Sequence, residues 1–264
     1  MPEFKAAQDY FHPALPFYTL LKKEILRFWS VALQTLVTPF ITASLYLLVF
    51  GLSLGNKFSV IPEFTYIQFV VPGLVLMGVI NNSFANTSSS LFFSRYLGNI
   101  VDLLVTPITP AQFIMAYTIA AMIRGILVGV SVLAISLVFT PLPWAHPFAA
   151  FAMVVLASFL FAQLGLIAAI FSNSFDALSM YTNFLILPLI YLGGLFYPIS
   201  LLPGIWKVLS HFNPLFYLID GFRQAVLGRG DTELWVDFLV AGGISAVLFA
   251  LAAYYIGKGH KMRT

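Results

Sequence analysis

Residues 111–139, AQFIMAYTIAAMIRGILVGVSVLAISLVF, decide the fold, because the whole stretch contains only one charged side chain, Arg124. At about 1.5 Å per helical residue, a run of this length can cross the roughly 30 Å hydrocarbon core of a bilayer. The rest of the chain has the same character. Of its 264 residues, 60% are hydrophobic and 9% are charged, against roughly 25% charged residues in an average soluble domain. We therefore expect an integral membrane protein.

Five further stretches on either side of this run are predicted to span the membrane by length and apolar composition. They are 31–54, 65–91, 148–172, 176–197 and 235–257. The segment 198–230 is also apolar, but prolines and charged residues interrupt every window of spanning length, so we expect re-entrant helices or an external segment there. The sequence thus predicts one all-α transmembrane domain over 1–264, with six spans.

The distribution of Lys and Arg predicts the orientation of these spans. With both termini in the cytoplasm, eight basic residues fall inside and four outside, leaving Arg124 within a span. We therefore expect both termini in the cytoplasm, together with the loop between the second and third spans. The first thirty residues contain several charges and prolines and no apolar core, so we expect no secretory signal.

The loop RYLGNIVDLLVTPITP, at 95–110, is longer than a simple turn requires. Its apolar positions fall on one side of a helix predicted at 95–106: Leu97, Ile100, Val101 and Leu104. The other side carries Arg95, Asn99, Asp102 and, as an apolar exception, Leu103. Two interpretations stay open: a short interfacial helix that eases the turn, or a docking helix whose exposed leucine is covered by a partner.

The N-terminal segment LPFYTLLKKEILRFW, at 15–29, also has two sides. One stripe is apolar, with Phe17, Leu20, Leu21, Ile25 and Phe28; another contains Thr19, Lys22, Lys23 and Arg27. This pattern is typical of an amphipathic helix lying in the membrane interface. It could serve only as a basic anchor, or it could also contact a partner.

Polar residues within the spans are the other candidates for function. Arg124 must face protein or water, because a lone arginine at this depth costs between about 3 and over 10 kcal/mol. Asn81 and Asn82 are candidate partners, and Asn86 follows in the segment NNSFANTSSS at 81–90. The arginine could be structural or could contact a substrate. The small polar residues could serve close helix packing or line a wet path near a dimer axis.

Several classes of protein are disfavoured. The four histidines are scattered, there is no cysteine, and no G-x-x-x-x-G-K-[ST] loop is present. The acidic residues lie outside the spans or at their edges, which argues against ion coupling. A net charge of +3 does not suggest nucleic acid. We expect no catalytic residues, no metal and no cofactor in this chain, and six spans of about 150 residues leave no room for a nucleotide-binding domain.

Four segments resemble type-2 ABC exporter permeases, and most of all their YadH-like bacterial subgroup. They are LLVTPITP after the glycine of GNIVD, VVPGLVLMGVI at 70–80, LPLIYLGGLFYPISLLPGIW at 187–206 and NPLFYLIDGFR at 213–223. They occur in the family's order, and the resemblance runs from about residue 18 to the C-terminus. One departure is that many members have a glutamate three residues after the loop glycine, where this chain has Val101 beside Asp102.

The resemblance implies the permease subunit of an exporter in the bacterial inner membrane. Such a subunit works as a homodimer with two copies of a separate ABC ATPase, which binds ATP and Mg, and moves an amphipathic or lipid-like substrate outward by alternating exposure. It implies a coupling helix at 95–106, with Arg95, Asn99, Asp102 and Leu103 facing the ATPase, and a connecting helix at 15–29 that also touches it through Lys22, Lys23 and Arg27. The alternative is a channel or facilitator that needs no ATPase.

Overall fold

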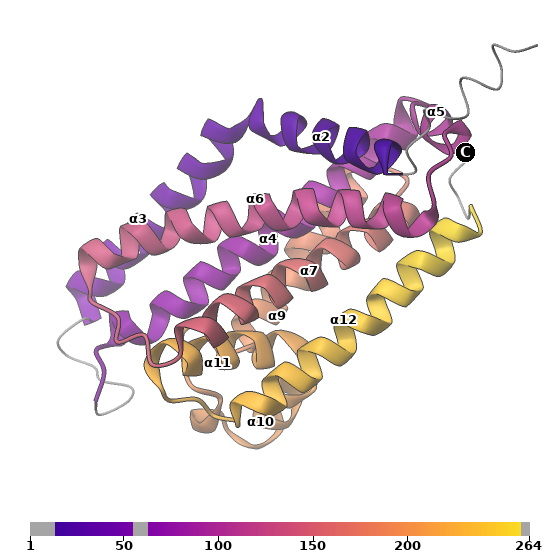
Figure 1. The fold of residues 1–264 in the computed structure, drawn as a ribbon. Coiled ribbons are helices and arrows are strands. Elements are labelled where there is room, and N and C mark those ends of the chain that lie inside the picture. The colour runs from indigo at the N-terminus through magenta and orange to yellow at the C-terminus, as the bar shows by residue number, and fades with distance from the viewer. Residues whose placement is uncertain (1–13, 55–62, 260–264) are drawn as a thin grey trace, which may run out of the picture.

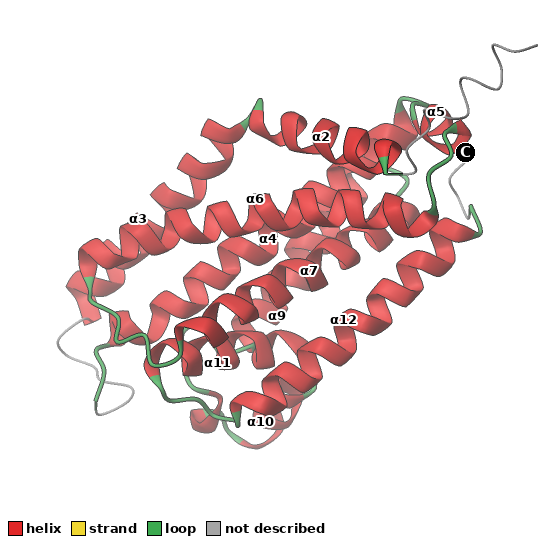
Figure 2. Cartoon of the chain, viewed as in Figure 1, coloured by secondary structure: helices red, strands yellow, loops and turns green. Residues whose placement is uncertain are grey.

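The structure, a computed structural model, describes residues 14–54 and 63–259 as an all-helical fold (Figure 2). Among these residues, six helical segments are long and apolar enough to cross a membrane. They are α3 (Ala32–Leu54), α4 (Tyr66–Tyr96), α6 (Pro110–Phe139), α7 (Pro147–Phe171), the run from α8 to α9 (Phe175–Leu192) and α12 (Leu234–Gly257). The prediction of an all-helical fold is confirmed, and its six long apolar helices fit a membrane protein.

Helices α4 and α7 form the buried centre of the bundle, and the other spans surround them. The two helices approach closely because Gly165 on α7 has no side chain: a Cβ atom there would lie 2.5 Å from the carbonyl oxygen of Phe84 on α4. The hydroxyl of Thr87 donates a hydrogen bond of 2.9 Å to the carbonyl oxygen of Ala162 across the same contact. The small polar residues of 81–90 therefore serve close helix packing in part.

The fifth span is not one regular α-helix. It consists of α8 (Phe175–Met180), a π-helical segment, η1 (Tyr181–Ile186), and α9 (Leu187–Leu192). Pro188 in the first turn of α9 has no backbone N–H to donate to the preceding turn, and widening into a π-turn accommodates this gap. The span ends at Leu192, five residues before the predicted end, where Gly194 adopts a positive φ of 84°.

Three short helices follow before the last span: η2 (Ile199–Leu201), α10 (Gly204–His211) and α11 (Pro214–Leu227). Asn213 caps α11 by accepting from Leu215 N and also donates to Leu189 O of α9 at 2.6 Å. Arg223 is buried and donates to the carbonyl oxygens of Gly194 at 2.6 Å and Phe69 at 3.3 Å. These contacts tie the segment to α9 and α4. Its predicted re-entry into the membrane stays a prediction.

The bundle has two distinct ends (Figure 1). The start of α2 (Leu15–Trp29), the short helix α5 (Ile100–Val105) and the end of α12 lie at one end, and α10 and α11 lie at the other. Consistent with this, a Cβ on Gly257 at the end of α12 would lie 3.9 Å from Pro110 at the start of α6. The first and last described residues are thus on one side of the bundle, as an even number of spans requires.

The loop helix is shorter than predicted at 95–106. Helix α4 continues to Tyr96, so Arg95 belongs to α4, and α5 begins only at Ile100. Gly98 separates the two helices with a φ of 73°, a left-handed conformation that ends a helix.

The apolar side predicted for the loop helix is only partly correct. Ile100 is buried, but Leu97 and Val101 are exposed, because the turn at Gly98 rotates them away from the bundle. The side chains of Leu103 and Leu104 lie outside the described part of the structure.

Candidate functional site

Helix α2 buries a carboxylate in the bundle. Its most buried residues are Leu20, Glu24 and Phe28, spaced four apart along one face. Glu24 is completely buried, and its Oε2 accepts hydrogen bonds from Ser90 Oγ at 2.5 Å and Arg27 Nε at 3.2 Å. Glu24 was not among the residues predicted for the site, although its spacing from Leu20 and Phe28 places it on the apolar stripe.

Arg27 extends this contact to the second span. Its Nη2 donates to both oxygens of Asn86, the backbone carbonyl at 3.0 Å and the side-chain Oδ1 at 2.9 Å. The end of α2 is thereby bonded to the middle of α4. Of the three basic residues predicted to touch a partner, Arg27 thus has partners within the chain, whereas Lys22 and Lys23 are exposed.

Arg124 meets the same asparagine from α6. Its Nη1 donates to Asn86 Oδ1 and its Nη2 to Asn82 Oδ1, both at 3.4 Å. Arg124 thus contacts one of its two candidate partners, Asn82, together with Asn86, and the described residues show no hydrogen bond between it and the other candidate, Asn81. We call Glu24, Arg27, Asn82, Asn86, Ser90 and Arg124 the arginine network.

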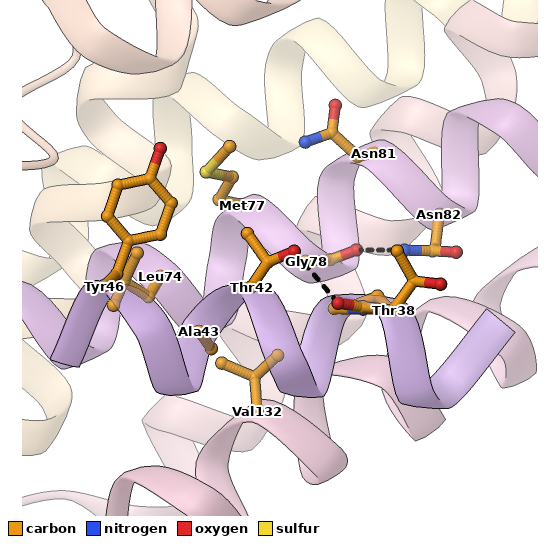
Figure 3. A pocket seen from close by; sticks show the side chains of 11 residues that line it. Thr38, Thr42, Ala43, Tyr46, Leu74, Met77, Gly78, Asn81, Asn82 and Val132 are labelled. Carbon is orange, nitrogen blue, oxygen red and sulfur yellow. Dashed lines mark hydrogen bonds between the residues drawn. The ribbon is translucent and has the colours of Figure 1, made fainter. Parts of the chain in front are cut away.

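Figure 3 shows a cavity of about 170 Å³ next to the arginine network, between α3, α4 and α6. Tyr46 lies toward one end of the cavity, and Thr38 and Asn82 lie toward the other. Its lining combines hydroxyl and amide groups with apolar side chains such as Met77. Asn81 also lines it, and its buried Oδ1 has no hydrogen-bond partner among the residues that the structure describes.

The cavity and the arginine network are connected through one side chain. Asn82 lines the cavity, donates to Gly78 O at 3.1 Å and accepts from Arg124. A continuous chain of hydrogen bonds therefore runs from Arg27 through Asn86, Arg124 and Asn82 to the cavity wall.

Of the residues predicted to contact an ATPase, Arg95, Asn99 and Asp102 lie at the end of the bundle that carries α5. Asn99 and Asp102 are exposed there. Arg95 has an intramolecular role, since its Nη1 donates to Ala169 O at 2.5 Å and Ile170 O at 3.0 Å. These carbonyls belong to the last turn of α7, where a cation also interacts favourably with the helix dipole.

Comparison with known proteins identifies relatives of most of this chain. The family model described as "ABC-2 type transporter" matches residues 16–227, from α2 to the end of α11. The inner membrane transport permease YadH of Escherichia coli K12 is 42% identical over 235 residues, which cover 89% of this chain and 90% of the relative, and the Shigella flexneri protein of that name matches equally. Nodulation protein J of Sinorhizobium fredii is 24% identical over 212 residues, 79% of this chain and 78% of that protein.

Proposed function

Because this chain belongs to the ABC-2 type transporter family, we propose that it is the membrane-spanning subunit of an ATP-driven exporter. The chain is a multi-pass inner-membrane protein of a transport permease family. In the proposal, two copies pair with two copies of a separate ABC ATPase, which binds ATP and Mg, and both termini lie in the cytoplasm. The pair moves an amphipathic or lipid-like substrate outward by alternating exposure.

The position of α5 carries this proposal. Helices α4 and α6 contain 31 and 30 residues, so each is about 45 Å long and exceeds the roughly 30 Å hydrocarbon core by about 15 Å. A short helix between their ends stands clear of the membrane if this excess lies on the cytoplasmic side. The turn before this helix exposes Asn99, and the helix itself exposes Val101 and Asp102, so that a soluble ATPase can bind them.

The arginine network supports a path by which movement of the ATPases is transmitted to the cavity. Helix α2 begins at the same end as α5, and its last turn is bonded through Arg27 to Asn86. When closure of the ATPases shifts α2, this contact must move or break. The displacement then passes through Arg124 to Asn82 and alters the wall of the cavity.

The size of the cavity supports the homodimer. A pocket for a complete small ligand has a volume of roughly 300–1,000 Å³, whereas the cavity within one chain has about 170 Å³. One copy therefore accommodates part of a substrate, and a second copy supplies the remainder of the path.

Copurification from native membranes tests the proposal. We expect the tagged permease to retain an ATP-hydrolysing subunit, with a mass that corresponds to two copies of each chain. The double variant Val101→Asp, Asp102→Lys should reduce ATPase capture at least about tenfold, because it changes both an apolar and a charged contact on α5. Lys207→Glu, an exposed charge reversal on α10, should leave capture unchanged.

Two results would contradict this reading. Transport by the permease with no ATPase in the purified complex would favour the facilitator, the alternative that needs no ATPase. Full ATPase capture by the α5 double variant would exclude α5 as the docking helix.

A further inference from the structure

The arginine network contains two guanidinium groups and one carboxylate. Glu24 is hydrogen-bonded to Arg27 and Ser90. Arg124 forms no ion pair with any carboxylate among residues 14–54 and 63–259. Its two hydrogen bonds to amide oxygens are both 3.4 Å, and its buried Nε has no partner in the same part of the chain. The network thus carries a net positive charge located on Arg124.

The depth of Arg124 makes this unbalanced charge unfavourable. Fifteen residues separate it from Phe139 at the outer end of α6, a rise of about 22 Å along the helix. If that end lies at the outer surface, Arg124 lies inside the inner half of the roughly 30 Å hydrocarbon core. A charge at this depth requires a partner, and the described residues offer only the two long bonds to amides.

The neighbouring cavity can hold the molecule that supplies this partner. Asn82 lies between Arg124 and the cavity. Within residues 14–54 and 63–259, the lining includes no Lys, Arg, Asp or Glu and so adds no competing charge, and Leu74, Met77 and Val132 give it an apolar wall. An acyl or alkyl chain can lie against this wall while its head group reaches the arginine.

We propose that Arg124 and Asn82 bind the phosphate or carboxylate group of an anionic amphiphile, whose apolar chain occupies the cavity between α3, α4 and α6. The anion completes the arginine network by balancing its charge. The amphiphile is either the transported molecule, in which case the inference rests on the proposed function, or a phospholipid of the membrane. Both sources share an oxyanion joined to an apolar chain.

Equilibrium binding of labelled dodecyl phosphate to the full-length permease, in phosphatidylcholine nanodiscs with empty discs as background, tests the site. We expect unlabelled dodecyl phosphate to displace the label and dodecyl maltoside, which has the same chain and a neutral head, to displace it poorly. Arg124→Gln should raise the Kd at least about tenfold, the equivalent of one charge-assisted hydrogen bond. Arg124→Lys should retain most of the binding. Arg229→Gln, which removes an exposed arginine on the outer side, should leave the Kd unchanged.

A second variant keeps the test decisive if Arg124→Gln fails to fold. Asn82→Asp places a carboxylate beside Arg124 and balances its charge within the chain. We expect this variant to lose dodecyl phosphate binding by at least about tenfold without a loss of thermal stability. Wild-type binding by either Arg124→Gln or Asn82→Asp, or equal displacement by the maltoside, would overturn the proposal.

Phosphatidylglycerol distinguishes the two sources of the anion. If discs with equal parts of phosphatidylglycerol and phosphatidylcholine suppress dodecyl phosphate binding, the site accepts a phospholipid head group. If they do not, it selects the single-chain amphiphile expected of a transported molecule. Both outcomes support an anion site at Arg124. The experiment uses the permease alone, so a failure to find an ATPase partner would leave its result unaffected.

Discussion

Glu24 is a single side chain on which the inner contacts of α2 depend. It is completely buried and accepts hydrogen bonds from Ser90 and Arg27. Removing one partner of a buried ion pair costs roughly 3–5 kcal/mol, because the other charge is left unpaired. The side chain of Arg27 is 31% exposed, so water can solvate part of its charge. The loss of stability on removing Glu24 should therefore be smaller.

We expect Glu24→Ala to lower the free energy of unfolding by about 2 kcal/mol, and Glu24→Gln by less, since the amide oxygen can still accept from Ser90. In a thermal melt of the purified permease this corresponds to a decrease in Tm of roughly 4–8 °C. Lys23→Ala is the matched control: its ammonium lies 3.9 Å from Glu24 but is half exposed, so Tm should barely change. A wild-type Tm for Glu24→Ala would show that the buried carboxylate does not stabilise the fold.

The sequence predicted some of these residues and not others, for a physical reason. The cost of a charge within a span required partners for Arg124, and Asn82 was among the candidates because it lies on the neighbouring span. Arg27 belongs to the polar stripe of a helix that was expected to lie in the membrane interface and to touch an ATPase, whereas Glu24 lies on its apolar stripe. Their hydrogen bonds depend on Ser90 and Asn86 of α4, and a helical wheel of α2 alone does not show which residues of another helix it packs against.

At the scale of elements, glycines determine how closely the central helices pack. A Cβ on Gly165 would overlap Thr87 Oγ1 and lie 2.5 Å from the carbonyl oxygen of Phe84. The second contact is to backbone, which cannot move aside without shifting α4. On α12, by contrast, a Cβ on Gly242 would meet no atom within 4 Å.

We therefore expect Gly165→Ala to destabilise the permease by about 1–3 kcal/mol, despite the helix propensity of alanine, which favours the substitution by about 1 kcal/mol. Gly242→Ala keeps the propensity gain without the clash, so it should be neutral or slightly stabilising. Thermal unfolding of both variants in one detergent measures the difference. Equal Tm values for the two would mean that α4 and α7 can separate at no cost.

The same elements show where sequence-based prediction succeeds. Length and apolar composition predicted the bounds of the six long helices to within a few residues at most ends, because the bilayer imposes these two requirements on each span separately. The break at Gly98 was missed, since a glycine within a helical pattern is compatible with either continuation or a left-handed turn. The π-helical segment before Pro188 was missed as well, because it depends on how the surrounding helices accommodate the lost hydrogen bond.

At the scale of the whole molecule, the two ends of the helical bundle are built from different elements. The start of α2, α5 and the end of α12 share one end of the bundle, and α10 and α11 form the other. The bundle alone does not say which end faces the cytoplasm. The distribution of basic residues along the sequence predicts the answer: with both termini and the loop at 95–110 in the cytoplasm, eight of them fall inside and four outside.

Single-cysteine labelling can test this orientation without background, because the chain contains no native cysteine. Asn99→Cys and Lys258→Cys introduce exposed thiols at the end with α5, and Lys207→Cys introduces one on α10. We expect a membrane-impermeant maleimide to label only position 207 in spheroplasts of intact cells, and to label 99 and 258 after the inner membrane is permeabilised. Labelling of 99 and 258 in the intact spheroplasts would show that the protein has the opposite orientation. Helix α5 would then lie on the outer side, where a cytoplasmic ATPase cannot bind it. Labelling of only one of those two would mean an odd number of crossings between them, so that at least one of the helices α6 to α12 does not cross as its length and composition predict.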